Sequence, residues 1–306
     1  MPNDYKQLAW SDQLVDDCLQ LVRLAIREDL DREQDWTTVA LVSPTQKSQA
    51  TIVARQDGVF CGQHVVDVIA TAMQLTVETE TFAEDGDAVV GGTQLVRITG
   101  NARDILTAER TILNFMGRLC GIATHTAKFV AGVRGTNVGV FDTRKTTPGW
   151  RRLEKFAVRC GGGTNHRTGL FDAILIKDNH LAFAGLVDTP DLAVAKIREF
   201  LEHADSPVER EQMPITVEVD SLEQLARVLP ANPDIVLVDN MTLDQLREAS
   251  RMRTAAAPDV ILEASGGITL ELLAAVAKTG IDRVSIGALT HSAINMDLGL
   301  DWLVPS

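Results

Sequence analysis

Residues 215–239 read ITVEVDSLEQLARVLPANPDIVLVD, and this stretch decides the fold. Two apolar runs, Ile215–Val219 and Ile235–Val238, have the length and the β-branched composition of buried strands. Between them, Leu222–Leu229 has the apolar spacing of a short helix. A strand, a helix and a second strand in this order predict one βα repeat with parallel strands.

The same rhythm extends through the second half of the chain. From Ile215 onward, four strand-like runs begin 20 to 25 residues apart. In all we expect six parallel strands, at Val138–Phe141, Ala173–Ile176, Ile215–Val219, Ile235–Val238, Val260–Leu262 and Arg283–Ile286. We expect helices near Leu192–His203, Leu222–Leu229, Leu243–Arg253 and Leu270–Thr279. The pattern predicts an α/β barrel, in which ligands bind at the carboxyl ends of the strands.

The first hundred residues have a different pattern, typical of an α+β domain. One helix is expected at Asp12–Asp29, and the glycines of Glu84–Val96 predict a hairpin. A long helix, Ala102–Val133, should join the two halves. Short strands are expected at Ala50–Arg55, Leu75–Phe82 and Thr93–Thr99.

Composition excludes several classes of protein. The 306 residues are 45% apolar and carry a net charge of -13, which argues against non-specific nucleic-acid binding. No apolar run approaches the length of a membrane span, and the first residues lack a signal-peptide pattern, so we expect a cytoplasmic protein without a membrane partner. The four cysteines are scattered with no C-x-x-C, which predicts free thiols and argues against a zinc site.

One segment reverses the acidic balance of the chain. Phe141–His180 contains eight Lys and Arg residues against four acidic ones, so it carries +4 while the remainder carries -17. A solvated helix face would explain the basic residues of Arg151–Arg159. It explains the remaining cations poorly, because they flank glycines or end an apolar run. A pocket for a small polyanion is the better interpretation, with donors from Arg144, Lys145, His166, Arg167 and Lys177.

Polar residues at the ends of the later strands predict a phosphate site and a metal site. Ser265-Gly266-Gly267 and Ser285 with Gly287 follow successive strands, where backbone N–H groups can approach a phosphate. Glu218 and Asp239 end adjacent strands and offer the hard oxygen ligands that suit Mg²⁺. Alternatively, these two carboxylates form ion pairs with Lys145 or Lys177. No Ser-His-Asp or Cys-His set indicates covalent catalysis.

Nine strings, which occur in the same order in one known family, narrow this interpretation. They include TAER (107–110), NFMGRLCGIAT (114–124), DTRKTTPG (142–149), AVRCGGGTNHR (157–167), LIKDNH (175–180), EASGGI (263–268) and SIGALTHS (285–292). Together they cover roughly Ala102 to Ser292, and the chain resembles the quinolinate phosphoribosyltransferases.

The resemblance implies a reaction and a role for each candidate residue. Quinolinate and 5-phosphoribosyl-1-pyrophosphate would give nicotinate mononucleotide, pyrophosphate and CO₂, with Mg²⁺ as cofactor. Arg144, His166, Arg167 and Lys177 would hold the carboxylates of quinolinate, and Lys145 would lie between the substrates. Glu218 and Asp239 would serve the metal, ribose and pyrophosphate, while the Ser265 and Ser285 loops would take the 5-phosphate.

The resemblance also implies an architecture and an assembly. It implies an N-terminal α+β sandwich (1–118, joined by the tail 291–306) and an incomplete, seven-stranded α/β barrel (119–290). Homodimers would share their active sites, with Arg110 supplied by the partner subunit, and a hexamer is left open.

Three alternatives stay open at this stage. A paralogue from molybdenum-uptake operons shares the barrel but takes a different acceptor, which the intact set of cations disfavours. A lyase or aldolase with a Schiff-base lysine would need Lys145 or Lys177 in an apolar pocket. A non-catalytic sensor of phosphorylated metabolites would not need the pair Glu218 and Asp239.

Overall fold

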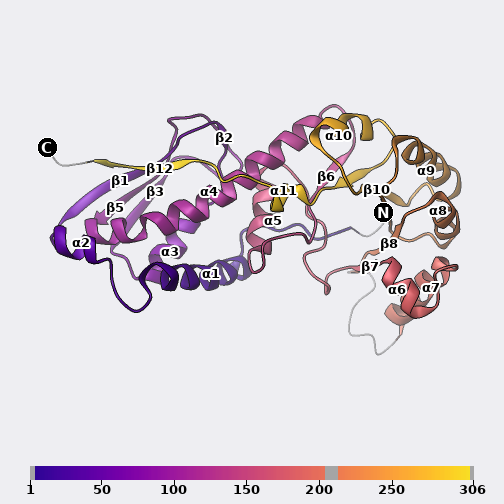
Figure 1. The fold of residues 1–306 in the computed structure, drawn as a ribbon, viewed down its shortest axis with the longest axis horizontal. Helices are drawn as coiled ribbons and strands as arrows, with labels where there is room; N and C mark the ends of the chain where they lie inside the picture. The colour runs from indigo at the N-terminus through magenta and orange to yellow at the C-terminus, as the bar shows by residue number, and fades with distance from the viewer. Residues whose placement is uncertain (1–3, 204–212, 304–306) are drawn as a thin grey trace. The chain divides into compact units, whose positions relative to one another are not determined.

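The computed structural model describes residues 4–203 and 213–303 (Figure 1). Its internal contacts divide the chain into two compact units. The first unit comprises residues 1–7, 128–144 and 164–287, and the second comprises residues 8–127, 145–163 and 288–306. The expected domain division after residue 118 stays a prediction, because these units are defined by contacts within the chain and each combines several separate segments.

The first unit is built around a parallel sheet with the strand order β6-β11-β10-β9-β8-β7. Each strand lies on one of the six apolar runs, because buried parallel strands need apolar side chains on both faces. The strands are β6 (Gly139–Phe141), β7 (Ile174–Ile176), β8 (Ile215–Val219), β9 (Ile235–Asp239), β10 (Ile261–Ser265) and β11 (Arg283–Ser285). Although β6 and β7 follow each other along the chain, they lie at opposite edges, so the expected open α/β barrel is confirmed.

The described residues contain six strands of this sheet, so the expected seven-stranded barrel is not found among them. Beyond β6, Thr164 forms a single parallel bridge with Phe141. Three glycines precede Thr164, and Gly162 has a φ of 82°, which breaks extended backbone. The seventh position is therefore reduced to one bridge.

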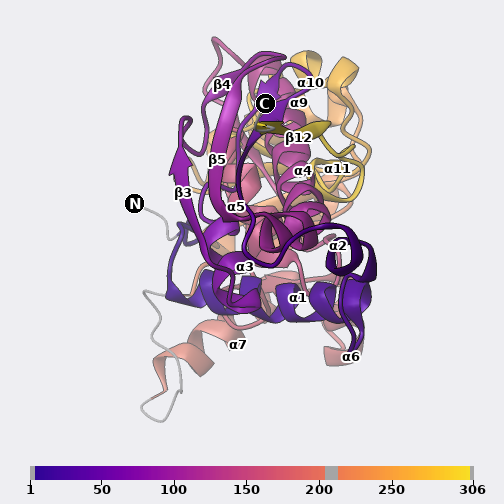
Figure 2. The same cartoon turned by 90° about the vertical axis from the view of Figure 1, so that its left-hand side faces the viewer.

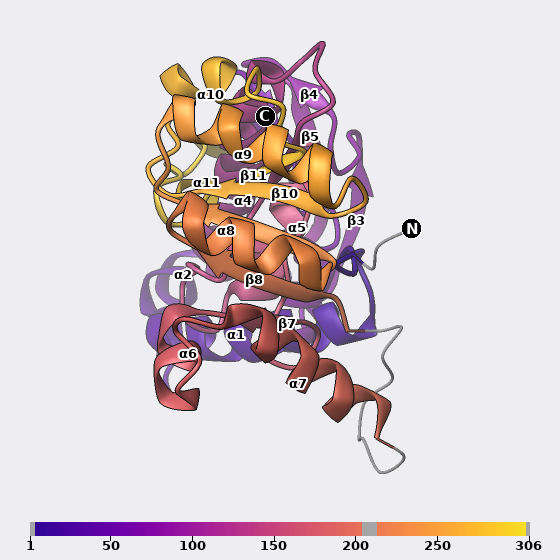
Figure 3. The same ribbon diagram turned by 90° about the vertical axis from the view of Figure 1, so that its right-hand side faces the viewer.

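Helices cover the outer face of the parallel sheet (Figure 3). They are α6 (Asp178–Ala184), α7 (Pro190–Glu202), α8 (Leu222–Val228), the 3₁₀ turn η2 (Leu229–Ala231), α9 (Leu243–Ala256) and α10 (Leu270–Val276). In this layer α8 contacts β8 and α9 contacts β10. Ser221 and Thr242 cap α8 and α9 by accepting the backbone N–H of Gln224 and Gln245. Helix α6 was not expected from the sequence, because it begins just after an apolar strand.

The second unit contains an antiparallel sheet with the strand order β12-β1-β5-β3 (Figure 2). Its strands are β1 (Lys47–Ala54), β3 (Val77–Thr81), β5 (Gln94–Asn101) and β12 (Leu298–Leu303). Its helices are α1 (Asp12–Leu30), α2 (Trp36–Leu41), α3 (Val65–Met73), α5 (Arg151–Cys160) and α11 (Ala288–His291), together with most of α4 (Ala102–Gly132). The two long helices expected from the sequence agree with α1 and α4 within one residue.

The hairpin expected at Glu84–Val96 is wrong. The segment does turn, with the N–H of Thr93 donating to the carbonyl of Val90. However, β4 (Ala88–Val89) pairs with β2 (Gly58–Val59), while β5 pairs with β1 and β3. The glycines therefore mark a turn between two ladders, which spacing along the chain does not distinguish from a hairpin.

Two glycines of α4 let the C-terminal segment cross this helix at close range. The N–H of Met296 donates to the carbonyl of Gly117 at 2.9 Å. A Cβ at Gly117 would lie 3.0 Å from the carbonyl oxygen of Met296, and a Cβ at Gly121 would overlap that of Ile294. This crossing directs the chain into β12, which pairs with β1 along Leu298–Leu303.

None of the helices within residues 4–203 and 213–303 has the length and apolar character needed to cross a bilayer.

Replacing Gly121 by Ala should destabilise the second unit, because the new methyl group meets backbone that cannot rotate away. We expect a loss of about 1–3 kcal/mol in the free energy of unfolding, measured by denaturant titration. Gly117→Ala, with its longer 3.0 Å contact, is the matched control and should cost less. Equal stability of Gly121→Ala and the unchanged protein would contradict the close crossing.

Candidate functional site

The carboxyl ends of the parallel strands bring five predicted site residues onto one face of the sheet. Asp239 pairs with Ser265, and Ser265 pairs with Ser285. Glu218 pairs with Leu237, two residues before Asp239, so the carboxylates of Glu218 and Asp239 share this face. Ile176 pairs with Val217, which places the next residue, Lys177, level with Glu218. We call these residues the carboxyl-end row: Lys177, Glu218, Asp239, Ser265 and Ser285.

The turn after β10 requires glycine. Gly266 and Gly267 have φ values of 87° and 60°, in the left-handed region that side chains other than Asn and Asp rarely adopt. A Cβ at Gly266 would also overlap the side-chain carbonyl of Asn240. The N–H of Asn240 donates to the carbonyl of Ser265 at 2.9 Å, so the loops after β9 and β10 are fixed to each other.

The acidic members of the row already contact other side chains. The ammonium of Lys177 forms an ion pair with the carboxylate of Glu218. The side-chain amide of Asn240 donates to Asp239 Oδ2 at 2.8 Å. The ion pair with Lys177 that was considered as an alternative for Glu218 is therefore present in the structure. The side chain of Lys177 is 42% exposed and that of Glu218 is 19% exposed, so an incoming cation or anion can compete with this ion pair.

Two guanidinium groups lie close together without a full set of acceptors. Arg167 is buried, and its Nε, like that of Arg144, has no hydrogen-bond partner among the described residues. Burial is the largest cause that lowers the pKa of Arg167, and the charge of Arg144 adds to it. Two neighbouring guanidinium groups whose Nε atoms lack acceptors match a ligand with more than one carboxylate.

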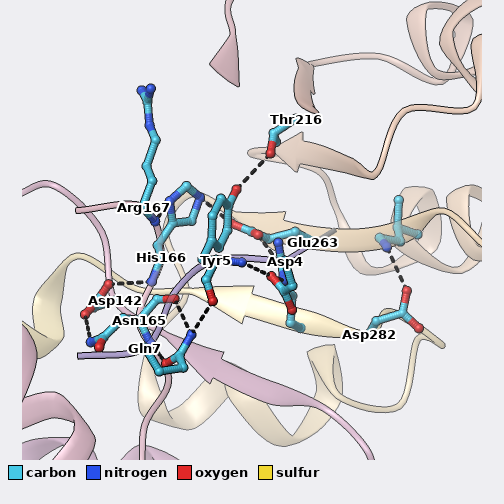
Figure 4. Close-up of polar contacts among 12 residues, drawn as sticks. Asp4, Tyr5, Gln7, Asp142, Asn165, His166, Arg167, Thr216, Glu263 and Asp282 are labelled. Carbon is cyan, nitrogen blue, oxygen red and sulfur yellow. Dashed lines mark hydrogen bonds and ion pairs between the residues drawn. The ribbon is translucent and has the colours of Figure 1, made fainter. Parts of the chain in front are cut away.

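His166 is held firmly in the interior of the first unit (Figure 4). Its backbone N–H donates to Asp142 Oδ1 at 2.8 Å, and its Nδ1 accepts the N–H of Arg167 at 2.8 Å. The ring proton therefore belongs on Nε2, which lies 3.4 Å from Glu263 Oε1. Both ring nitrogens thus face groups of the protein, and an interaction with a ligand would require the Nε2 contact to be exchanged.

Tyr5 is buried against the ring of His166. The two rings stack with centroids 4.1 Å apart, and the Tyr5 hydroxyl hydrogen-bonds Thr216 Oγ1 at 2.8 Å. Gln7 fixes this segment by accepting the N–H of Asn165 at 2.7 Å and donating to its carbonyl at 3.1 Å. Burial raises the pKa of Tyr5, which keeps its hydroxyl protonated.

A buried ion pair supports this arrangement. Arg283 Nε donates to Glu263 Oε2 at 2.7 Å, and its guanidinium lies over the rings of Tyr5 and Phe141, 4.9 and 4.4 Å from their centroids. Burial raises the pKa of Glu263, but the opposite effect of His166 and Arg283 is larger in sum and lowers the pKa to about 2. Glu263 is therefore ionised, and Nη1 of Arg283 also donates to Asp4 Oδ1 at 2.7 Å.

No role in the site was expected from the sequence for Tyr5, Asp142, Glu263 or Arg283. A signal was present for two of them, because Glu263 directly follows one apolar strand run and Arg283 begins another, at positions where a charge is rarely buried. Asp142 and Tyr5 gave no such signal, since a strand-end aspartate and an N-terminal tyrosine are both common.

Arg110 and Lys145 belong to the second unit. Both are exposed, with Arg110 on α4 and Lys145 in the segment after Arg144. The carbonyl of Lys145 accepts the hydroxyl of Thr290 at 2.7 Å, which fixes its backbone. Their predicted roles stay predictions.

Changing Glu263 to Gln should reduce stability on the order of 3 kcal/mol, because Arg283 then remains buried beside a neutral partner. The lowered pKa stabilises the fold above the ordinary value of 4.5, and this contribution is lost as the pH falls toward about 2. The difference in unfolding free energy between the two proteins should therefore shrink across that range. Glu218→Gln, which removes only a partly exposed ion pair, is the control and should cost about 0–1 kcal/mol. A pH-independent difference would contradict the assigned ionisation.

Comparisons with known proteins point to one family. The model of the quinolinate phosphoribosyl transferase C-terminal domain matches residues 122–301, and that of the N-terminal domain matches residues 35–120. The chain is 42% identical over 296 residues to the nicotinate-nucleotide pyrophosphorylase [carboxylating] of Mycobacterium leprae, covering 95% of this chain and 99% of that protein. It is 38% identical over 256 residues to the probable enzyme of that name from Bacillus subtilis, with 84% of each chain covered.

A solved structure gives the same result for the fold. The nicotinate-nucleotide pyrophosphorylase from Francisella tularensis superposes with a TM-score of 0.85 at 34% identity, covering 98% of this chain and 100% of that one. Two matched domain models, relatives above 30% identity and a shared fold lead to one conclusion. The chain belongs to the quinolinate phosphoribosyltransferase family.

Proposed function

We propose that the protein transfers the phosphoribosyl group of phosphoribosyl pyrophosphate to quinolinate, with loss of CO₂, to give nicotinate mononucleotide and pyrophosphate for NAD biosynthesis. Family membership supports the reaction class. The observation that carries the substrate assignment is the pair of neighbouring guanidinium groups of Arg144 and Arg167, whose Nε atoms lack acceptors. Quinolinate brings two adjacent carboxylates to such a pair.

Cations around Arg167 would bind quinolinate. Arg144 and Arg167 can each form paired hydrogen bonds with a carboxylate. Lys177 would leave Glu218 or share it, because their exposed ion pair is weak. His166 contributes its Nε2–H after exchange of the contact with Glu263, and Asp142 and Tyr5 fix its position.

The carboxyl-end row would bind phosphoribosyl pyrophosphate. Its 5-phosphate lies over the turns of Ser265, Gly266 and Gly267 and of Ser285 and Gly287, where backbone N–H groups without side chains in front can approach an anion. Glu218 and Asp239 lie on adjacent strands and face the same side, a set of hard oxygen donors that fits Mg²⁺. When bound there, Mg²⁺ supplies positive charge to the pyrophosphate and ribose oxygens.

The chemistry needs positioning more than covalent catalysis. Pyrophosphate leaves with the electron pair of its bond to C1, and the ribose acquires positive charge that the carboxylates of Glu218 and Asp239 stabilise. The pyridine nitrogen then forms the new bond to C1. The ring becomes cationic, which stabilises the electron pair left on the ring carbon when the adjacent carboxylate departs as CO₂, and that carbon then takes up a proton from water. Lys145 would lie between the substrates, and a fixed arrangement of cations overcomes the repulsion between two anions.

A Schiff-base mechanism is disfavoured by the surroundings of Lys177. Its ammonium is ion-paired with Glu218 and 42% exposed, rather than enclosed by apolar side chains.

In this proposal the protein is cytoplasmic and forms a homodimer. The homodimer either is the complete assembly or is the building block of a hexamer. The chain segments before and after the edge strand β7 carry large apolar side chains that are about half exposed or more, which is typical of a subunit interface. They are Leu170, Phe171, Phe183, Val187, Leu192 and Phe200. In such a dimer, Arg110 of one subunit would complete the site of the other.

The reaction is tested in a steady-state assay with quinolinate, phosphoribosyl pyrophosphate and Mg²⁺, following nicotinate mononucleotide and CO₂, with nicotinate as a parallel acceptor. We expect turnover of quinolinate alone. Arg167→Ala should raise the KM for quinolinate roughly 10- to 100-fold, the worth of a lost charged hydrogen bond, with little change in the KM for phosphoribosyl pyrophosphate.

Arg251→Ala is the control for this variant, because Arg251 is an exposed α9 residue that forms a surface ion pair with Glu248. It should leave both constants unchanged. Binding of phosphoribosyl pyrophosphate without turnover of quinolinate would contradict the proposal and favour an enzyme with another acceptor.

Shared sites are tested by mixing two inactive variants, Arg110→Ala and Lys145→Ala. Each hybrid dimer would hold one intact site and one site with both changes. Random exchange of subunits should therefore restore roughly a quarter of the original activity. Proven exchange, by mass spectrometry of differently labelled subunits, without recovery would contradict the contribution of Arg110 across the interface.

A further inference from the structure

Three potential metal ligands that are far apart in the sequence converge within the second unit. They are Cys61, Asp85 and Cys160, and one donor atom of each lies within 4.8 Å of the other two. Cys61 follows β2, Asp85 lies in the loop between β3 and β4, and Cys160 is the last residue of α5. The cluster uses none of the residues assigned to the proposed reaction.

The carboxylate of Asp85 is already oriented. Its Oδ1 accepts the N–H groups of Gly62 at 2.6 Å and Gln63 at 3.0 Å, and Gln63 Oε1 accepts the N–H of Asp85 at 3.0 Å. These bonds tie the loop of Asp85 to the turn that carries Cys61. They leave Oδ2 for a further partner, as is common for metal-binding carboxylates held by outer hydrogen bonds.

A third cysteine fixes the backbone of Cys61. The N–H of Cys61 donates to Cys120 Sγ at 3.2 Å, and the thiol of Cys120 donates to the carbonyl of Cys61 at 3.2 Å. Cys120 lies on α4 and is fully buried. Its thiol therefore supports the cluster from behind.

The three donor groups differ in access to solvent. Cys61 is fully buried, whereas Asp85 and Cys160 are partly exposed, so one side of the cluster is open. Burial raises the pKa of Asp85, and burial with the neighbouring Cys160 raises that of Cys61. His64, stacked on Trp10, is the nearby side chain whose charge opposes this effect at Asp85. A divalent cation would displace the protons and neutralise the ionised groups.

We propose that Cys61, Asp85 and Cys160 bind one Zn²⁺ ion, with water at the open fourth position. Tetrahedral Zn²⁺ holds sulfur at about 2.3 Å and carboxylate oxygen at about 2.1 Å, so its ligand atoms lie roughly 3.6–3.8 Å apart. The present spacing of up to 4.8 Å would have to shorten by at most about 1.2 Å. Thiolates select Zn²⁺ over Mg²⁺, which separates this site from Glu218 and Asp239.

The ion would act as a structural link. Cys160 is followed directly by Gly161-Gly162-Gly163 and, after two more residues, by His166 and Arg167. Gly162 has a φ of 82°, and Gly163 donates back to the carbonyl of Val158. A metal bond at Cys160 would fix the end of α5 to the loop of Asp85 and hold the start of this segment.

The test uses the full-length protein, reduced, stripped with a chelator and exchanged into metal-free buffer. Zn²⁺ is titrated against a competing chelator dye, and Co²⁺ serves as the spectroscopic probe of thiolate ligation. We expect one bound ion per chain, thiolate-to-cobalt charge-transfer absorption, and a Tm that rises with Zn²⁺. Loss of a residue that hydrogen-bonds a metal ligand weakens metal binding roughly 10–100-fold. Cys160→Ser and Asp85→Asn remove a ligand itself, so each should weaken Zn²⁺ binding by more than this.

Cys18→Ser is the matched control, because Cys18 is a buried cysteine of α1 outside the cluster. It should bind Zn²⁺ as the unchanged protein does. Binding by Cys160→Ser with unaltered affinity, or cobalt spectra without charge-transfer bands, would overturn the proposal. One further result would overturn it: metal-free protein forms a disulfide between Cys61 and Cys160 and, after that disulfide is reduced, Zn²⁺ does not raise the Tm of the protein. Because none of these three readouts depends on turnover, failure here is distinguishable from failure of the proposed reaction.

Discussion

Parallel pairing in register is the constraint on which the arrangement of the candidate site depends. Because side chains alternate along each strand, a one-residue slip between β9 and β10 would turn Asp239 and Ser265 to opposite faces. The register is stabilised from within, since Glu263 of β10 and Arg283 of β11 are paired neighbours that also bond each other through their side chains. The same strand register therefore places both the interior ion pair and the carboxyl-end row.

That interior pair has a second consequence for specificity of the fold. A buried charge tolerates few arrangements, because every alternative that separates Glu263 from Arg283 leaves an uncompensated ion. Tyr5 adds to this selectivity, since its ring lies between Arg283 and His166 and its hydroxyl reaches Thr216. Residues from the beginning of the chain and from four different strand regions thus share one set of contacts around His166.

Much of this could be predicted from the sequence, and the limits have physical causes. Continuous apolar runs fixed the six parallel strands, because their composition and length leave little alternative. The row at their carboxyl ends followed from topology alone. Tyr5 was not predictable, since stacking on His166 depends on a long-range return of the chain. The hairpin at Glu84–Val96 failed because turns specify a reversal and not the strand that pairs afterwards. Scattered cysteines argued against zinc, yet the fold brings Cys61 and Cys160 together across ninety-nine positions of sequence.

The position of β12 has a consequence for synthesis of the chain. This strand completes one edge of the antiparallel sheet by pairing with β1 through Leu298–Leu303, although almost 250 residues separate the two strands. While the polypeptide is still being made, β1 therefore presents unpaired backbone groups and the apolar residues Ile52 and Val53 at an open edge. A nascent chain of this protein remains prone to pairing with other chains until the last strand emerges, and removal of that strand would make the exposure permanent.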